Sequence, residues 1–216
     1  MRKISFAPDE YYHIYNRGNS KQVIFKEKSD YNRFIKLLFL SNGSNNFKIL
    51  HLGKDVYDFD RGEQLVDIGI YCLMPNHFHL LLKQTNTGNI SKFMQKLSTG
   101  YSMYYNKKYE RTGSLFEGRF KAEHVDNDRY LKYLFSYIHL NPVKIINPDW
   151  KEEGIKNKIN VIKFIKDYQF SSSQDYFGID REETKILNIK AFPNYFPNKK
   201  SFENEIFDWF DYKDSL

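Results

Sequence analysis

Short runs of alternating or β-prone residues are interspersed along the chain with longer segments in which apolar residues recur every three or four positions. A period of two predicts β-strands, and a period near 3.6 predicts helices. The predicted strands span residues 11–17, 46–54, 65–74, 77–83 and 118–125, and the predicted helices span 28–43, 89–109 and 126–140. Pro75 and Asn76 separate two of the strand-like runs, which form either a hairpin or one bent strand.

The predicted order of elements is β-α-β-β-α-β-α. This order is typical of an α+β fold of the ferredoxin-like or RRM-like kind, in which an antiparallel sheet carries helices on one face. We assign residues 1–150 to this domain. Residues 151–216 differ in character, and their short helical and loop-like segments predict a helical C-terminal extension.

The composition adds many aromatic side chains and an uneven positive charge. Aromatic residues make up 18% of the chain, and its net charge is +6. Residues 1–150 carry 22 basic and 15 acidic side chains, whereas residues 151–216 carry 11 and 12, so the excess lies in the first part. A basic, aromatic-rich domain suits single-stranded nucleic acid, because phosphates attract cations and bases stack on rings. A merely basic soluble protein is the alternative.

The chain has one cysteine, Cys72, which excludes a disulfide framework and a zinc cluster built from cysteines. No apolar stretch has the length of a signal peptide or of a membrane span. We therefore expect a soluble protein of the cytoplasm with no membrane partner.

Two histidines stand one residue apart in the otherwise apolar run YCLMPNHFHLLLK, residues 71–83. Side chains alternate along a strand, so we expect His77 and His79 to share one face while Phe78 points to the other. A neutral imidazole binds Mn or Zn well and accepts Mg when oxygen ligands complete the shell. The pair therefore predicts a metal site that needs a further ligand from another element. The alternative is two histidines on a polar sheet face.

The helix predicted over residues 126–140 offers candidates for that further ligand. Tyr137 and Asn141 are four residues apart and share a helix face, whereas His139 lies about 200° around the helix from Tyr137. The side chains of Tyr137 and Asn141 are therefore expected to point into the same site. A stripe of tyrosine and leucine is more often core packing, and this is the alternative interpretation.

Four segments of the chain follow one another between residues 13 and 144: HIYNRGNSKQVIF, YCLMPNHFHLLLK, RTGSLFEGRFKAEHVDND and SYIHLNPVK. They resemble the successive signature segments of the single-tyrosine HUH transposases, and most closely those of the REP-associated tyrosine transposases. YQFSSSQDYFG, further on, resembles that group's C-terminal region.

The resemblance implies a role for each site residue. His77, Phe78 and His79 match the metal-binding HUH motif, Tyr137 matches the nucleophile, and Asn141 matches the polar residue that assists the metal. Many insertion-sequence relatives carry Gln at this last position. The REP-associated group is similar to this chain in carrying Asn, whose amide reaches less far than that of Gln.

The resemblance also implies the reaction. Tyr137 would attack single-stranded DNA at sites that bear hairpin (palindromic) elements, form a 5′-phosphotyrosine and leave a free 3′-OH. A second 3′-OH would reverse the step on another strand, which gives strand transfer without ATP. The expected cofactor is a divalent metal, Mg or Mn, and the expected assembly is a monomer or a homodimer.

Three cations are expected to contact DNA. Arg17 ends the first strand, and Arg119 and Lys121 alternate with Phe120, as groups that neutralise phosphates and stack on bases do. The alternative is that they are solvated surface charges. We interpret His13 as a structural residue rather than a DNA contact.

Two other functions stay open. One is a non-catalytic module that binds single-stranded nucleic acid on its sheet. The other is a metal-dependent DNA hydrolase, in which the histidine pair works with an acid from Asp126 or Asp128.

Overall fold

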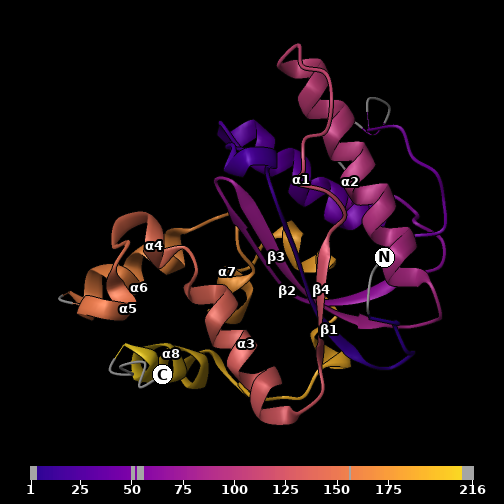
Figure 1. The fold of residues 1–216 in the computed structure, drawn as a ribbon. Helices are drawn as coiled ribbons and strands as arrows, with labels where there is room; N and C mark the ends of the chain where they lie inside the picture. Colours follow the sequence, from indigo (N-terminus) through magenta and orange to yellow (C-terminus); the bar gives the residue numbers. More distant parts are fainter. Residues whose placement is uncertain (1–3, 50–51, 53–55, 156, 211–216) are drawn as a thin grey trace.

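A four-stranded antiparallel sheet forms the centre of the computed structural model, which describes residues 4–49, 52, 56–155 and 157–210 (Figure 1). The expected α+β arrangement is confirmed. Pro75 and Asn76 join two strands that pair with each other, so this part of the chain is a hairpin rather than one bent strand. The strands are β1 (Tyr11–Arg17), β2 (Val66–Met74), β3 (His77–Gln84) and β4 (Lys121–Val125), in the order β2-β3-β1-β4.

Helices lie on both faces of the sheet. α1 (Lys28–Ser41) and α2 (Asn89–Lys108) pack against each other and share one core with the sheet. α3 (Asp128–Leu140) packs on the opposite face (Figure 1). The expectation of helices on one face therefore holds for α1 and α2, and α3 departs from it. Because side chains alternate along the strands, each strand contributes apolar residues to the cores on both faces. The core under α1 and α2 contains Ile14, Phe78 and Leu80. The core under α3 contains Ile70, Cys72 and Leu81.

Capping residues explain where α1 and α3 begin. Glu27 precedes α1 and forms a capping box with Asp30, which lies in the first turn of the helix. Asn127 precedes α3, and its side chain accepts a hydrogen bond from the Tyr130 backbone N–H at 2.7 Å. α3 ends at Leu140. Asn141 still has helical backbone angles (φ −51°, ψ −41°), so the hydrogen-bonding pattern stops at Pro142 because proline has no backbone N–H to donate.

Two predicted strands differ from the structure. Residues 46–48 have no regular structure, and residues 50–51 and 53–54 of the same predicted strand lie outside the described residues. Phe47 and Ile49 pack against the core under α1 and α2, so their alternation reflects a loop that covers the core. The strand predicted over residues 118–125 begins only at Lys121. Gly118 has a φ of 137°, which side chains other than glycine rarely adopt, and pairing with β1 starts after it.

Short helices after residue 141 pack beside α3 around a separate apolar cluster that includes Trp150, Ile165 and Phe202. None of the helices within the described residues is both long and apolar enough to cross a membrane. These helices are α4 (Val143–Ile146), α5 (Trp150–Glu153), α6 (Lys158–Asp167), α7 (Ser173–Tyr176) and α8 (Lys199–Trp209), with 3₁₀ turns at Asn19–Lys21, Val56–Asp58, Glu182–Ile186 and Ile189–Ala191.

Replacing Ile14 by Ala is expected to lower the free energy of unfolding by about 2–5 kcal/mol, because the change leaves a cavity in the core between β1 and the helices. The Ile14 side chain is 0% exposed, whereas Ile159 on α6 is 77% exposed. Ile159→Ala is therefore the matched control, with an expected change within about 0.5 kcal/mol. Urea unfolding at unchanged slope measures both values. Equal losses for the two variants would contradict this assignment of the core.

Candidate active site

The histidine pair lies on β3, on the face of the sheet that carries α3. The ring centroids of His77 and His79 are 5.1 Å apart and the rings are nearly perpendicular. Phe78, between them, is fully buried on the other face, where its ring packs 4.9 Å from that of Phe34. The strand thus presents two imidazoles together while Phe78 anchors it in the core.

Hydrogen bonds to the Nδ1 atoms orient both rings. His77 Nδ1 lies 2.6 Å from Asn76 Oδ1. An amide oxygen only accepts, so His77 Nδ1–H donates and the Nε2 lone pair is left for a ligand. His79 Nδ1 lies 2.9 Å from His13 Nε2. In the tautomer in which His79 Nδ1–H donates to His13, the Nε2 lone pair of His79 is likewise left for a ligand.

His13 belongs to the site, which the interpretation of His13 as a purely structural residue did not anticipate. Its ring stacks on that of His79, with centroids 5.1 Å apart, and is 4% exposed. Its Nδ1 atom lies 3.7 Å from Glu123 Oε2. Tyr15 and Tyr130 donate hydrogen bonds to the same carboxylate, at 2.8 and 3.0 Å. A row of polar groups therefore runs from Glu123 through His13 to His79.

The register of the strands is what brings this row together. His13 on β1 lies opposite Glu123 on β4, and Tyr15 lies opposite His79 on β3. Sequence reasoning missed Glu123 because the register was unknown. The available signal was parity, since His13, Tyr15 and Arg17 alternate on one strand as His77 and His79 do on another.

Burial holds these imidazoles in their neutral form. Burial and nearby cations, Lys144 first among them, lower the pKa of His77 to about 4. Burial also lowers the pKa of His13 to about 4, although the charge of Glu123 opposes the shift. The pKa of His79 falls well below its ordinary value, because burial adds to the influence of the neighbouring histidines. Neutral imidazoles are the form that binds a metal ion.

Tyr137, in the last turn of α3, meets the histidines edge-on. Its ring centroid lies 6.0 Å from that of His79 and 6.3 Å from that of His13, with both interplanar angles at 83°. The Tyr133 ring stacks against it at 5.5 Å and Lys151 Nζ lies 5.2 Å from its centroid. α3 therefore holds this phenol beside the histidine pair within a single chain.

The surroundings of Tyr137 favour the neutral phenol in the free protein. Burial, with a further contribution from the charge of Glu123, raises its pKa above the ordinary value. Lys144 and Lys151 line a small cavity together with the Tyr137 ring, so positive charge lies near it. Positive charge near a phenol opposes such a rise of its pKa, because it favours the charged form.

Asn141 lies one turn after Tyr137 and is 5% exposed. Its Nδ2 atom donates to the Tyr137 carbonyl at 3.0 Å, which fixes the amide at the end of α3. Within the described residues, no three His, Cys, Asp or Glu side chains form a metal cluster. The donor set nevertheless fits a hard divalent ion, in which two neutral imidazoles are completed by oxygen atoms of an amide, of water or of a phosphate.

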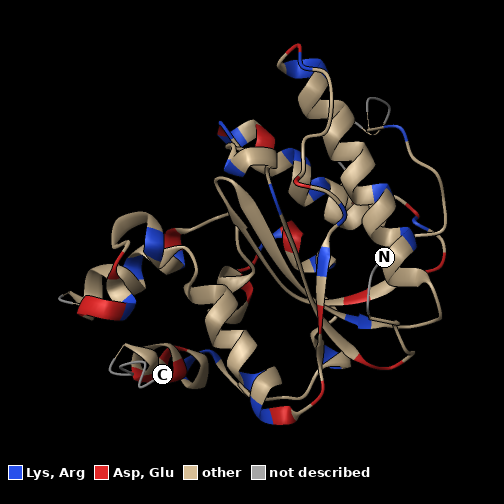
Figure 2. Ribbon diagram, in the orientation of Figure 1, with Lys and Arg blue, Asp and Glu red and all other residues tan. Residues whose placement is uncertain are grey.

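A cavity of about 340 Å³ opens beside the histidine pair. Arg17 and Lys121 line it together with His77 and His79, so two of the three expected DNA-contacting cations lie at the site. Arg17 also forms a two-pronged ion pair with Glu117, through Nε and Nη2. In Figure 2, basic residues colour the start of β4 and the C-terminal end of α2.

Arg119 lies elsewhere, which corrects the expectation that it shares a strand face with Lys121. β4 begins only at Lys121, and the turn at Gly118 directs Arg119 into a second cavity. Alternation does not apply to residues that precede the strand.

Part of the chain is similar in sequence to a known protein family. Residues 61–141 match the sequence profile of the family described as "Transposase IS200 like". The matched segment contains the histidine pair, Tyr137 and Asn141. A search of curated protein sequences found no match.

Two solved structures match the chain, one of them with a similar fold. The structure of a REP-associated tyrosine transposase bound to a REP hairpin superposes with a TM-score of 0.53, at 12% sequence identity, covering 85% of this chain and 89% of the other. The tRNA(His) guanylyltransferase from Saccharomyces cerevisiae gives a TM-score of 0.37 at 12% identity, covering 91% of this chain and 86% of the other, and this score is too low to indicate a shared fold. Residues 61–141 thus match the IS200-like transposase family, and the fold that carries them is similar to that of a REP-associated tyrosine transposase.

Proposed function

We propose that this protein cleaves and rejoins single-stranded DNA at hairpin-bearing sites, with Tyr137 as the nucleophile. The observation that carries the proposal is the placement of the Tyr137 ring 6.0 Å from that of His79, whose side chain lines a cavity together with Arg17 and Lys121. The IS200-like segment supports a transposase, and the hairpin bound to the structural neighbour supports the choice of DNA.

The site fits a divalent ion, Mg or Mn. His77 and His79 would hold it through their Nε2 atoms, and Asn141 would assist from the end of α3. When bound, such an ion supplies positive charge that polarises the scissile phosphate and offsets the charge of the transition state.

The other steps belong to side chains of the chain. Lys144 and Lys151 line a cavity with the Tyr137 ring. The Tyr137 hydroxyl loses its proton to solvent, and the charge of the two lysines stabilises the phenolate that forms. The phenolate oxygen forms a bond to phosphorus as the bond from phosphorus to the 3′ oxygen breaks, and that oxygen takes up a proton. The phosphotyrosine retains the energy of the phosphodiester, so attack by another 3′-OH reverses the step without ATP.

The catalytic part is proposed to lie within residues 1–150, with residues 151–216 in a supporting role. α8 packs against α3, where Lys132 Nζ lies 2.9 Å from Glu205 Oε2 and the Trp209 ring packs 5.1 Å from that of Tyr133. Since α3 packs on the sheet of its own chain, one chain contains the whole site. This arrangement suits a monomer, or a homodimer whose two sites work independently.

The hydrolase alternative depends on Asp126 and Asp128, which lie at the start of α3. Asp128 precedes Tyr137 by nine residues, about 14 Å along the helix axis. Its carboxylate accepts a hydrogen bond from the Tyr195 hydroxyl at 2.5 Å. The histidine pair lies beside the other end of α3, so the geometry favours the tyrosine as its partner.

A covalent-trapping experiment tests the proposal. The protein is incubated with Mn or Mg and a labelled single strand that carries a hairpin, and the products are run on a denaturing gel. A protein-linked band that survives denaturation supports the tyrosine mechanism. Cleavage without this band would point to hydrolysis, and binding without cleavage would point to a non-catalytic module.

His13→Ala is expected to weaken Mn binding about 10- to 100-fold, because the change removes the partner that orients His79. Titration calorimetry or electron paramagnetic resonance of the Tyr137→Phe protein measures this affinity without turnover. His13→Gln, whose amide can still bond to His79, is expected to recover part of it. His124→Ala is the matched control, since His124 has the opposite parity on β4 and is paired with Glu10 at 2.9 Å. Unchanged Mn affinity in His13→Ala would contradict the orienting role.

A further inference from the structure

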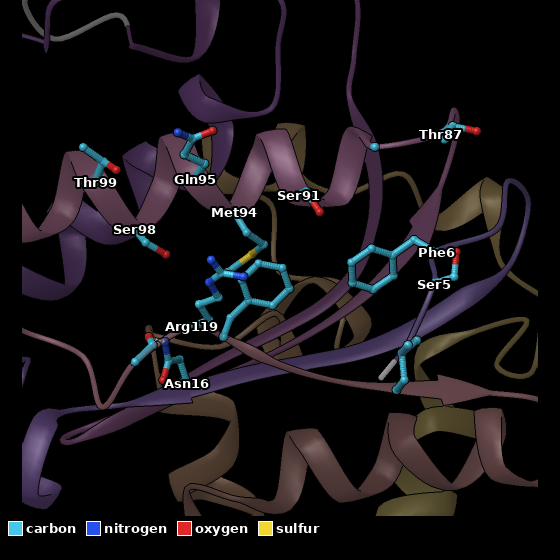
Figure 3. A pocket seen from close by; sticks show the side chains of 14 residues that line it. Ser5, Phe6, Asn16, Thr87, Ser91, Met94, Gln95, Ser98, Thr99 and Arg119 are labelled. Carbon is cyan, nitrogen blue, oxygen red and sulfur yellow. Dashed lines mark hydrogen bonds between the residues drawn. The ribbon is translucent and has the colours of Figure 1, made fainter. Parts of the chain in front are cut away.

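Glu123 is the acidic side chain that lies beside His13. It is near the middle of β4, directly opposite His13 on β1, and its Oε2 atom lies 3.7 Å from His13 Nδ1. That nitrogen is buried and has no hydrogen-bond partner among the described residues. Figure 3 shows that Arg119, a cation that precedes β4, lies beside another cavity, on the face of the sheet that α2 covers. The charge next to the His13 ring is therefore the negative charge of Glu123.

Two tyrosines hold this carboxylate in place and keep it ionised. Tyr15 donates a hydrogen bond to Oε1 at 2.8 Å, and Tyr130 donates one to Oε2 at 3.0 Å. Burial alone would raise the pKa of Glu123, but these two hydrogen bonds and the neighbouring His13 lower it below its ordinary value. Tyr15 belongs to β1 and Tyr130 belongs to α3, so the carboxylate is held from two sides. A fixed negative charge therefore lies on the Nδ1 side of the His13 ring.

The hydrogen bond between His13 Nε2 and His79 Nδ1, at 2.9 Å, can form in two arrangements of the protons. In the first, each ring carries its proton on Nδ1, so His79 donates to His13 and the Nε2 atom of His79 keeps its lone pair. In the second, each ring carries its proton on Nε2, so His13 donates and the Nε2 atom of His79 is protonated. A protonated ring nitrogen has no lone pair for a metal ion. Only the first arrangement therefore leaves a metal ligand at His79 Nε2.

The charge of Glu123 distinguishes the two arrangements. A carboxylate 3.7 Å away stabilises a proton on His13 Nδ1 and repels a lone pair there. We infer that Glu123 is a positioning residue, which selects the tautomer of His13 and, through it, the tautomer of His79 that can hold a divalent ion. This inference rests on the metal site of the proposed function. Glu123 is not among the residues that line the histidine cavity, so its influence on the ion passes through His13.

Nitrogen NMR of the metal-free protein, labelled with ¹⁵N-histidine, reads the tautomers directly. We expect His13 and His79 to be protonated at Nδ1 and unprotonated at Nε2, and we expect part of both rings to change tautomer together in Glu123→Gln. Glu10→Gln is the matched control, because it removes a carboxylate that lies 2.9 Å from another histidine, His124, and is expected to change neither ring. Protonation of His79 at Nε2 in the unaltered protein would overturn the inference, and so would unchanged tautomers in Glu123→Gln.

The affinity for Mn, measured in the Tyr137→Phe protein without DNA, provides the second test. Glu123→Gln is expected to weaken Mn binding about tenfold, because part of the protein then carries a proton on His79 Nε2. Glu123→Asp, which keeps the charge, is expected to recover most of this affinity. In His13→Ala, Glu123→Gln is expected to cause no further loss, since its path to the ion is already removed. A tenfold loss that persists in His13→Ala would indicate long-range attraction of the ion by the carboxylate and would refute selection of a tautomer. Where Glu123→Gln does not fold, the tautomers of Glu123→Asp and of the unaltered protein decide.

The outcomes separate this inference from the proposed function, because neither measurement depends on cleavage of DNA. A covalent adduct with the unaltered protein, together with tautomers and Mn affinity that are unchanged in Glu123→Gln, refutes the role of Glu123 and leaves the proposed function standing. Tautomers and Mn affinity that respond to Glu123→Gln as expected, together with the absence of any adduct, support the role of Glu123 and refute the proposed reaction.

Discussion

Tyr137→Phe is expected to abolish the covalent protein–DNA adduct, with a loss on the order of 10⁴-fold or more, because the change removes the only atom that attacks phosphorus. The ring itself stays, so its edge-on contact with His79 at 6.0 Å and its stacking on Tyr133 at 5.5 Å are retained. Affinity for the hairpin strand is therefore expected to stay within about twofold. A denaturing gel with labelled DNA measures the adduct, and fluorescence anisotropy measures the affinity.

Tyr133→Phe is the matched control for this prediction. Tyr133 lies one turn earlier on the same face of α3, and its ring stacks against that of Tyr137. Loss of its hydroxyl is expected to leave the adduct in place. If Tyr137→Phe still forms the adduct, the nucleophile is another residue. If both variants lose the adduct, the substitutions disturb the packing of α3, and the loss does not identify the nucleophile.

Much of the site follows from the two side-chain periods alone. A period of two places His77 and His79 on one face, and a period of 3.6 places Tyr137 and Asn141 one turn apart. These rules hold within an element, so residues close together in the sequence were assigned to a common face correctly. That the strand and the helix then lie together depends on packing of α3 against β2, β3 and β4, which the sequence indicates only through the apolar stripe on α3.

The periods of side chains within one element do not predict which residues face each other on neighbouring strands. His13 and Glu123 are 110 residues apart, and only the register of β1 against β4 sets them opposite each other. A shift of that register by one residue would turn Glu123 to the other face of the sheet. The position of Arg119 was missed for a related reason, since the φ of 137° at Gly118 interrupts the alternation that the sequence suggested.

The alternation of apolar and polar residues at 46–49 predicted a strand that the structure does not contain. Phe47 and Ile49 alternate with polar residues and pack on the core, yet these residues form no strand. A loop that crosses a core also buries every second side chain. The strands that did form have partners on at least one side, and the pattern of a single segment carries no information about whether a partner is available.

Removal of the histidine pair is expected to have the second largest effect. His77→Ala is expected to slow adduct formation about 10²- to 10⁴-fold at 1 mM Mn, the range that corresponds to several kcal/mol of transition-state stabilisation by a bound ion. His77 is only partly buried, so its truncation leaves the core intact. His79 is 7% exposed and stacks on His13, so His79→Gln is the preferred change there, since it nearly preserves the volume.

The two variants separate loss of the metal from loss of the fold. Because His77→Ala keeps one imidazole, a higher Mn concentration is expected to restore part of its rate. The double variant is expected to show no such recovery. Chelation of the metal from the unaltered protein is expected to stop adduct formation as fully as the double variant does. The midpoint temperature of unfolding of His77→Ala is expected to stay within a few degrees of that of the unaltered protein. Adduct formation at full rate in the double variant, or in the presence of chelator, would exclude a metal held by these imidazoles and would leave Lys144 and Lys151 as the cations that activate Tyr137.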